Sequence, residues 1–192
     1  MSPSITKMIR MDHSHAMMAF HKYDVNASAS KKQAVVKTVL LALEIHAQLE
    51  EEIFYPALQE VAPDNEALKK ARPEHDEMKR LIAQLRTMSP EDGAYDSTFM
   101  ELMRDVVHHV ADEETVMLPA AERLLKDRLG ELGAKMTARR LQLAAPHAGE
   151  IVANGVRAMP ATTVLMGAAL VGAGWLLARA LRPDGYRSHW RY

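Results

Sequence analysis

The sequence predicts an all-α fold, an antiparallel up-down four-helix bundle built from two similar halves, with further helices at the C-terminal end. Apolar residues recur at spacings of three and four along four long stretches, which is the pattern of amphipathic helices. Short polar loops join these stretches, and short connections favour antiparallel neighbours. The pattern His-x3-Glu-Glu-x4-Pro-Ala also occurs twice, at residues 46–57 and 109–120. This repeat indicates a pseudo-two-fold arrangement.

The composition narrows the class of protein and its partners. At 192 residues and 48% hydrophobic content, the chain is long enough for one domain of ordinary size with an appendage. Its 24 Lys and Arg residues nearly balance 25 Asp and Glu residues, so charge predicts no nucleic-acid partner. The chain has no cysteine, and any metal ion must be held by imidazole and carboxylate groups. Residues 1–20 lack the unbroken apolar run of a signal peptide, so we expect a cytoplasmic protein.

The first predicted helix covers residues 3–23. Apolar residues recur there at spacings of three and four, and His13 lies in the middle of the stripe that they form. A short polar linker follows at residues 26–30. Its serines, Ser28 and Ser30, are candidate N-caps for the next helix, because a hydroxyl oxygen can accept a hydrogen bond from a free N–H group at a helix start.

The second predicted helix covers residues 31–61. Its inner stripe includes His46 and Glu50 among Val, Leu, Ile and Ala. A His and a Glu four positions apart lie on one face of a helix, about 40° apart around the axis, and both can reach a single point. Pro56 removes one backbone hydrogen bond, but no turn residues follow it. We therefore expect a kink there and not the end of the helix.

The second half of the sequence repeats this arrangement. The predicted segments are a turn at residues 62–65, a helix to residue 88, a loop at 89–93 and a helix at 95–129. His75 lies at the centre of the third apolar stripe, and His109 and Glu113 lie on the fourth. These residues match their counterparts in the first half at offsets of 62 and 63, so the two helix pairs resemble one another.

Four imidazoles and two carboxylates would converge near the axis of such a bundle. The predicted metal ligands are His13, His46, Glu50, His75, His109 and Glu113. A single His on an apolar helical face is more often a hydrogen-bonded core residue than a ligand. Burying two carboxylates among apolar residues, however, is costly unless a metal ion compensates the charge or the carboxyls are protonated. Such nitrogen and oxygen ligands suit iron, manganese or zinc, and two carboxylates able to bridge suit a pair of ions.

Other acidic residues adjoin this set. Glu51 and Glu114 lie about 100° around their helices from the predicted ligands, so we expect them to support the ligands and not to bind the metal. Asp12 and Glu74 are candidates for the same supporting role. The remaining histidines lie off the inner stripes or outside the bundle and are predicted to be weaker candidates: His15, His21, His108, His147 and His189.

These motifs resemble the hemerythrin-like, HHE cation-binding domain family. The resemblance covers about residues 5–130. The residues that carry it are Asp12-His13, His46-x3-Glu50-Glu51 with Phe54-Tyr55-Pro56, Glu74-His75, and His109-x3-Glu113-Glu114 with Leu118-Pro119. The resemblance implies a four-helix bundle with a non-haem di-iron centre, its two Fe ions bridged by oxo or hydroxo. Such a centre binds O2 or NO, senses iron or redox state, or turns over peroxide.

One departure from the family bears on this chemistry. Oxygen-carrying hemerythrins have a second His four residues after the third-helix His, and this sequence has Lys79 there. They also have Asp where Glu113 stands. Fewer nitrogen ligands and more open positions favour onward reaction over reversible oxygen carriage. The resemblance therefore implies sensing, scavenging or peroxide decomposition, with a catalase-like or oxidase-like activity as one form of it.

The composition changes after the bundle, which is assigned to residues 1–130. The following segments are predicted as a short amphipathic helix, ending before Pro146, with a linker at 131–157, a hydrophobic helix at 158–181 and a basic tail at 182–192. The uncharged run from Ala158 to Ala178 is 21 residues long, enough to span a hydrocarbon core of about 30 Å. One hypothesis is that Ala158–Leu181 anchors the protein to the inner face of a membrane. The alternative is a helix that mediates homo-oligomer formation.

Three functions are compatible with these patterns. The first is a di-iron protein that binds or reacts with O2, NO or H2O2. The second is an iron-binding or storage module without turnover, and the third is a membrane-tethered structural bundle. The sequence has neither a Gly-rich phosphate loop nor a Ser-His-Asp arrangement, so nothing in it indicates nucleotide binding or hydrolysis.

Overall fold

A computed structural model describes residues 3–158 of the chain. Every element in that range is a helix, without any strand, which confirms the predicted all-α class. The elements are α1 (Ile5–Phe20), α2 (Ala29–Leu49), the π-helical η1 (Glu50–Phe54), α3 (Tyr55–Val61), α4 (Glu66–Thr87), α5 (Tyr95–Asp112), the π-helical η2 (Glu113–Met117), α6 (Leu118–Leu124), α7 (Leu129–Ala144), the 3-10 turn η3 (Ala145–His147) and α8 (Ala148–Ala158).

The predicted hydrophobic helix at 158–181 and the tail at 182–192 lie outside the described residues, apart from Ala158. Within residues 3–158, no helix has both the length and the apolar character needed to cross a membrane.

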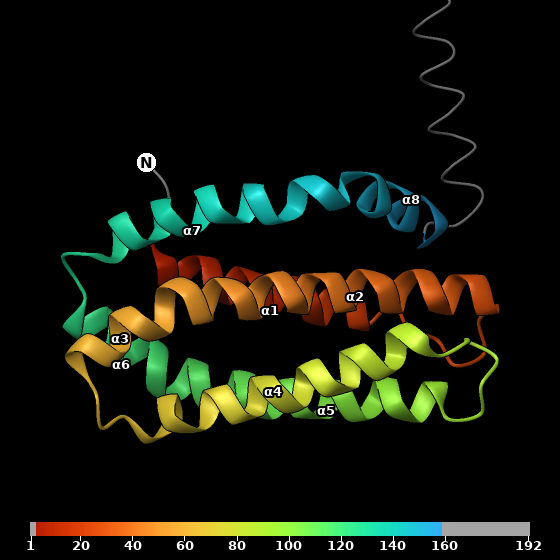
Figure 1. Ribbon diagram of the computed structural model, residues 1–192, viewed down its shortest axis with the longest axis horizontal. Coiled ribbons are helices and arrows are strands. Elements are labelled where there is room, and N and C mark those ends of the chain that lie inside the picture. Colours follow the sequence, from red (N-terminus) through yellow and green to blue (C-terminus); the bar gives the residue numbers. More distant parts are fainter. Residues whose placement is uncertain (1–2, 159–192) are drawn as a thin grey trace, which may run out of the picture. The chain divides into compact units, whose positions relative to one another are not determined.

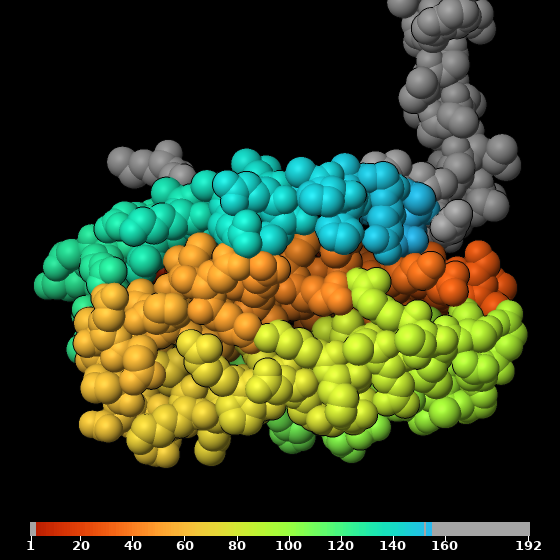
Figure 2. Space-filling model, in the orientation of Figure 1, coloured from red at the N-terminus to blue at the C-terminus, as the bar shows by residue number. Residues whose placement is uncertain are grey.

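Long helices lie side by side in the first part of the chain (Figure 1). Helix α1 packs against α2, α4 packs against α5, and α2 also contacts α4. Helices α7 and α8 lie along α1 and α2, on the side away from α4 and α5 (Figure 1). In Figure 2 the atoms of α7 rest directly on those of the α2 segment. The first two helices are therefore covered on both sides.

Side-chain caps fix where three of these helices begin. The side-chain oxygens of Ser4, Ser28 and Asn65 accept hydrogen bonds from backbone N–H groups three residues ahead, at 3.3, 3.4 and 3.1 Å. Each bond satisfies a donor that has no partner inside the helix. Ser28 is one of the two serines that the sequence proposed as caps, and α2 begins at Ala29, two residues before the predicted start.

The two π-helical turns lie directly before the repeated prolines. In η1 the N–H of Tyr55 donates to the carbonyl of Glu50, five residues back, and Leu118 repeats this bond to Glu113 in η2. A proline has no N–H to donate, and the wider turn accommodates it without stopping the helix. The helix therefore continues through Pro56, as the sequence predicted.

The π turns change which side chains face inward. Each turn holds one more residue than an α turn, so the inner stripe beyond it moves by about one position. An uninterrupted α-helical period from Glu113 predicts Val116 on the inner stripe. Val116 is 47% exposed, however, whereas the next residue, Met117, is 1% exposed. The prediction for Val116 was wrong because it extended the α-helical period through a π turn.

The end of the fourth helical segment also differs from the prediction. The sequence predicted one helix over residues 95–129, but α6 ends at Leu124 and α7 begins at Leu129. The chain turns back there because Leu125, Leu132 and Met136 are buried in the same core cluster as residues of α1. The charged residues between Leu125 and Leu129 form the turn.

The segment predicted as a linker is helical. The sequence placed a helix end before Pro146, yet the chain continues through η3 into α8, which packs against α2. Proline is tolerated in the first turn of a helix because the N–H that it lacks would have no partner there. The apolar pattern after residue 131 also predicts that Leu141 lies on the buried face of α7. Leu141 is instead 69% exposed.

A polar layer divides the apolar core into two clusters. The cluster around η1, η2 and α7 includes Phe54 and Tyr55, and the cluster toward the other end of the bundle includes Leu43, Met78 and Val106. The layer between them holds the buried histidines and glutamates. The two clusters hold that layer from both sides.

The contact between α7 and the start of α1 predicts a sensitivity at Gly133. A Cβ atom at Gly133 would lie 2.1 Å from the carbonyl oxygen of Pro3, closer than any real contact. We expect Gly133→Ala to lower the free energy of unfolding by about 1–3 kcal/mol, because α7 must move off α1. Gly130→Ala is the matched control, since no atom lies within 4 Å of its Cβ position. Urea unfolding of both variants tests this, and equal stabilities would contradict it.

Candidate metal centre

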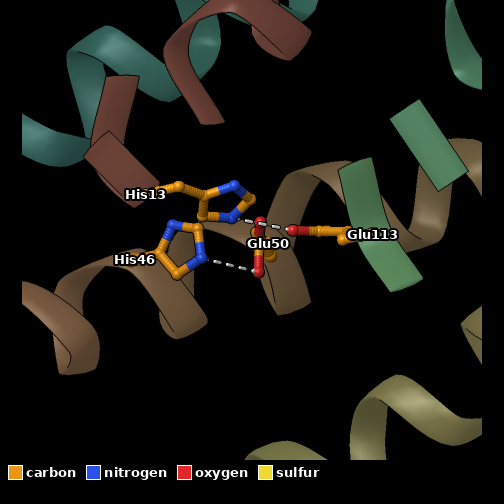
Figure 3. Close-up of side chains that lie close together, drawn as sticks. All are labelled: His13, His46, Glu50 and Glu113. Carbon is orange, nitrogen blue, oxygen red and sulfur yellow. Dashed lines mark ion pairs between the residues drawn. The ribbon is translucent and has the colours of Figure 1, made fainter. Parts of the chain in front are cut away.

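All six predicted ligand residues lie in the polar layer. Each is buried, with exposed fractions between 0% and 8%: His13, His46, Glu50, His75, His109 and Glu113. His13 and His75 come from the middle of α1 and α4, and His46 and His109 come from the last turns of α2 and α5. The glutamates begin the two π turns. Figure 3 shows four of them pointing toward one another from three different segments of the chain.

The six side chains form two overlapping groups that could each hold a metal ion. The first group is His13, His46, Glu50 and Glu113, and the second is Glu50, His75 and His109. Within each group one ligand atom of every residue lies within 4.8 Å of the others. Glu50 belongs to both groups, which is the arrangement expected of a carboxylate that bridges two ions. The role of these residues as ligands stays a prediction.

The Nε2 atoms of the histidines face the carboxylates. His13 Nε2 lies 3.0 Å from Glu113 Oε2, and His75 Nε2 lies 3.5 Å from Glu50 Oε2. These two contacts are equivalent in the two halves of the repeat, and each joins a histidine of one half to a glutamate of the other. The layer therefore links the halves through its polar groups.

A second set of carboxylates contacts the Nδ1 atoms on the far side of the rings. Glu114 lies 2.8 Å from Nδ1 of His13, and Glu51 lies 3.0 Å from Nδ1 of His75. A carboxylate at Nδ1 fixes the tautomer that leaves Nε2 free for a metal ion. The supporting role predicted for Glu51 and Glu114 agrees with these contacts.

Glu74 and Asp12 occupy the two remaining supporting positions. Glu74 lies 2.8 Å from Nδ1 of His109, within hydrogen-bond distance. Asp12 lies 3.6 Å from Nδ1 of His46, which is ion-pair distance and too long for a hydrogen bond. All four histidines therefore have a carboxylate behind them, three of them by a direct hydrogen bond.

Two basic side chains form ion pairs with the carboxylates that support the histidines. Lys79 contacts both carboxylate oxygens of Glu51 at 2.6 and 2.7 Å, and Arg140 of α7 contacts both oxygens of Asp12 at 2.5 Å. Lys79 therefore pairs with the carboxylate that supports His75. Arg140 connects α7 to the polar layer through Asp12.

The charges of the inner glutamates differ. Burial and the neighbouring Glu113 raise the pKa of Glu50 well above its usual value. Burial also opposes a charge on Glu113, but the contact with His13 and the charges of His109 and His46 together outweigh it and lower the pKa of Glu113. Two carboxylates this close cannot both be charged easily without a nearby cation. A metal ion would allow both to ionise.

Two of the four histidines are held in the neutral form that binds metals. Burial lowers the pKa of His46, and burial together with the neighbouring His109 lowers the pKa of His75 to about 3. His13 differs: burial favours its neutral ring, but Glu113 and Glu114 raise its pKa. A metal ion binds the neutral imidazole, so His46 and His75 have no proton to lose at neutral pH.

Unsatisfied polar atoms in the layer fit a metal ion. Buried atoms with no hydrogen-bond partner among the described residues include Nε2 of His13, both ring nitrogens of His46, Oε1 of Glu50 and both carboxylate oxygens of Glu113. A buried polar atom without a partner is costly, and such atoms are rare in native structures. The donor set of imidazole nitrogens and carboxylate oxygens suits iron, manganese or zinc.

Tyr55 is a site residue that the sequence reasoning did not assign. Its hydroxyl donates to Oε2 of Glu50 at 3.2 Å and lies 3.1 Å from Nε2 of His75. Burial and the nearby Glu50 raise the pKa of Tyr55, so it stays a phenol. Its counterpart in the second half, 63 residues on, is Leu118. The sequence did offer one signal for Tyr55, because it is a polar residue whose counterpart in the repeat is apolar.

Residues 4–121 match the family model of the hemerythrin HHE cation-binding domain, which is more than half of the chain. The chain belongs to the hemerythrin HHE cation-binding domain family. The predicted resemblance is thereby confirmed. In this HHE domain, the helices α7 and α8 lie beyond the matched residues.

Two known proteins are similar to this HHE domain, one in sequence and one in structure. A DNA nickase of Nostoc sp. (strain PCC 7120 / SAG 25.82 / UTEX 2576) is 27% identical over 128 residues, which is 67% of this chain and 36% of the relative. The chain thus spans about a third of that protein. A crystal structure of a hemerythrin HHE cation-binding domain-containing protein from Mycobacterium kansasii has a TM-score of 0.65 at 23% identity, covering 81% of this chain and 99% of the other. The likeness to the Mycobacterium kansasii protein shows that the two chains share a fold.

The supporting carboxylates of the HHE domain give a test of the centre. We expect Glu74→Gln to weaken metal binding by about 10–100-fold, because the charge behind His109 is lost. Glu77→Gln is the matched control, since Glu77 lies on the same helix and pairs only with Arg80 in its described contacts. Competition with a chelator measures both affinities. Equal affinity of Glu74→Gln and the unchanged protein would contradict this role.

The pKa of His75 gives a pH dependence for the metal-free HHE domain. His75 has a pKa of about 3 when folded, against 6.5 for a free side chain. The unfolded chain therefore binds this proton first, and the stability present above about pH 6.5 is lost as the pH falls toward 3. His75→Gln should make the free energy of unfolding fall less steeply between about pH 6 and pH 4, by at most about 1.4 kcal/mol per pH unit. Denaturant unfolding at fixed pH values measures this, and an unchanged slope would argue against a neutral His75.

Proposed function

We propose that this HHE domain is an antiparallel four-helix bundle with pseudo-two-fold symmetry that holds two iron ions. The observation that carries this proposal is the set of buried, unsatisfied imidazole and carboxylate atoms in two groups that share Glu50. His13, His46 and Glu113 would complete the first site, and His75 and His109 the second. Family membership supports metal binding, and the donor set supports iron among the metals it suits.

We further propose that the centre reacts with O2, NO or H2O2. Bound iron would supply the redox chemistry, because its exchangeable positions can take up a small oxygen or nitrogen species. The chain contributes six ligand groups for two ions, fewer than octahedral coordination requires, so positions stay available. The outer carboxylates orient the rings and raise their basicity, which stabilises the oxidised metal.

Two residues favour onward reaction over reversible carriage. Lys79 stands where oxygen-carrying hemerythrins have a further ligand, and here it pairs with Glu51. Tyr55 places a phenol beside the second group, and its hydroxyl can donate a hydrogen bond to a bound oxygen species. A donor held in a buried site stabilises charge that develops during reduction. The proposed activity is therefore scavenging, sensing or decomposition of peroxide.

Iron storage without turnover is the alternative, and peroxide decomposition separates the two. We do not propose DNA nicking for this chain, because the likeness to the Nostoc nickase covers 36% of that protein and the net charge of this chain is −1.

The proposal also includes a location. We propose that the protein lies in the cytoplasm, with residues 158–181 as a membrane anchor or an oligomerising helix. A membrane-tethered structural role without metal is the third possibility that the same measurements address.

Iron content tests the proposed centre. Protein loaded with ferrous iron without air and then exposed to air should contain about two irons per chain. It should also show the absorption bands of an oxo-bridged pair and decompose added peroxide. Protein that purifies with stoichiometric zinc and takes up no iron would overturn the proposal, and an iron-loaded protein inert to peroxide would leave storage as the function.

Glu113, which belongs to the first group only, provides the variant for this test. Glu113→Ala should reduce bound iron from about two to about one per chain, because it removes a ligand of the first site and leaves the second group intact. Glu122→Ala is the control, since Glu122 lies one helix further along the same segment and contacts the exposed Arg10. The control should keep the iron content and spectrum of the unchanged protein.

A further inference from the structure

A cavity of about 220 Å³ adjoins the polar layer. All four ligand histidines line it, whereas Glu50 and Glu113 do not. The rest of its wall is mostly aliphatic. Apart from Ala47, the buried apolar members of that wall belong to a single core cluster: Ala16, Leu43, Met78, Ile82 and Val106. The cavity therefore lies between the histidines and this cluster, away from the cluster that holds Tyr55.

The cavity is larger than a diatomic molecule or peroxide requires. An apolar cavity of about 150 Å³ in a protein core is known to stay dry and to bind benzene. A cavity of about 220 Å³ exceeds that volume. A small oxygen species would leave most of the aliphatic wall without contacts, whereas an apolar organic molecule would gain dispersion contacts along it. The size and the lining both favour an organic occupant.

The rim of the cavity favours a neutral occupant. Its charged side chains include Lys79 and Arg140, which are 44% and 31% exposed, and Glu44. Each is already paired: Lys79 with Glu51, Arg140 with Asp12 and Glu44 with Arg86. These pairs cancel the local charge, so the rim offers little to hold an ion. Long, partly exposed side chains at the rim can also move aside more easily than the buried wall.

Helix α7 completes this cavity. Arg140 and Ala144 of α7 line it, and both lie beyond residues 4–121, the part that matches the HHE family model. The wall is therefore partly built by a segment that lies after the residues matched by the family model.

We propose that the cavity binds a neutral, apolar organic molecule of about the size of toluene, next to the imidazoles of the metal centre. This site goes beyond the proposed reaction with small oxygen and nitrogen species. It does not depend on that reaction, because the aliphatic wall provides the contacts. Binding should therefore be measurable in the zinc-loaded and in the metal-free protein, and a failure to bind iron would leave it intact.

Methionine methyl groups report on the cavity. In full-length, zinc-loaded protein with 13C-labelled methionine methyls, added toluene should shift the Met78 signal saturably. The signals of Met117 and Met136, which are buried in the other core cluster, should not move. No saturable shift of Met78 up to the solubility limit of toluene would overturn the proposal. Equal shifts of all three signals would also overturn it, because they indicate nonspecific partitioning.

Filling the cavity provides the second half of the test. Val106→Phe should weaken toluene binding at least tenfold, because the added ring occupies the cavity. Val107→Phe is the matched control, since Val107 is 46% exposed on the same helix and does not line the cavity. If Val106→Phe fails to fold, Ala16→Leu fills the cavity from α1 and carries the test. Toluene binding that is unchanged in the folded filling variant would place the site elsewhere and overturn the proposal.

Discussion

The fold depends on how two carboxylates are accommodated in the middle of an apolar core. Glu50 and Glu113 are fully buried between two hydrophobic clusters, where an unpaired charge is costly. Four imidazoles surround them, each backed by a further carboxylate on the side away from the centre. Without a metal ion the layer keeps unsatisfied atoms and one raised carboxyl pKa. A cation at the centre would resolve both, and its binding would then stabilise the fold.

The convergence of the six candidate ligands could be predicted from the sequence because these residues lie before the helices change period. His13, His46, His75 and His109 occupy regular α-helical turns, and the glutamates stand four residues after two of them. Over that span the α-helical period assigns each side chain to the inner face correctly. The repeat then supplied the partners, because equivalent residues of two similar halves must meet near the axis.

The same period fails beyond Glu50 and Glu113, where the π turns begin. Tyr55 lies five residues after Glu50, which in an α-helix would turn it about 140° away from the ligand face. The π turn rotates it back, so that its hydroxyl reaches Glu50 and His75. Neither the role of Tyr55 nor the exposure of Val116 follows from a regular helical pattern. The packing of α7 and α8 was also missed, because a turn of charged residues and a proline in a first turn do not show where the chain goes next.

The two sides of the polar layer differ, although the ligand set is nearly symmetric. On one side lie the π turns and Tyr55, which bring proton-donating and anionic groups to the centre. On the other side the histidines border an aliphatic cavity that α7 closes. The repeat accounts for the ligands, whereas the differences at Tyr55 and Lys79 and the addition of α7 lie outside it. A duplicated scaffold thus fixes where the candidate ligands lie, and the unrepeated residues decide what can approach them and which protons are within reach.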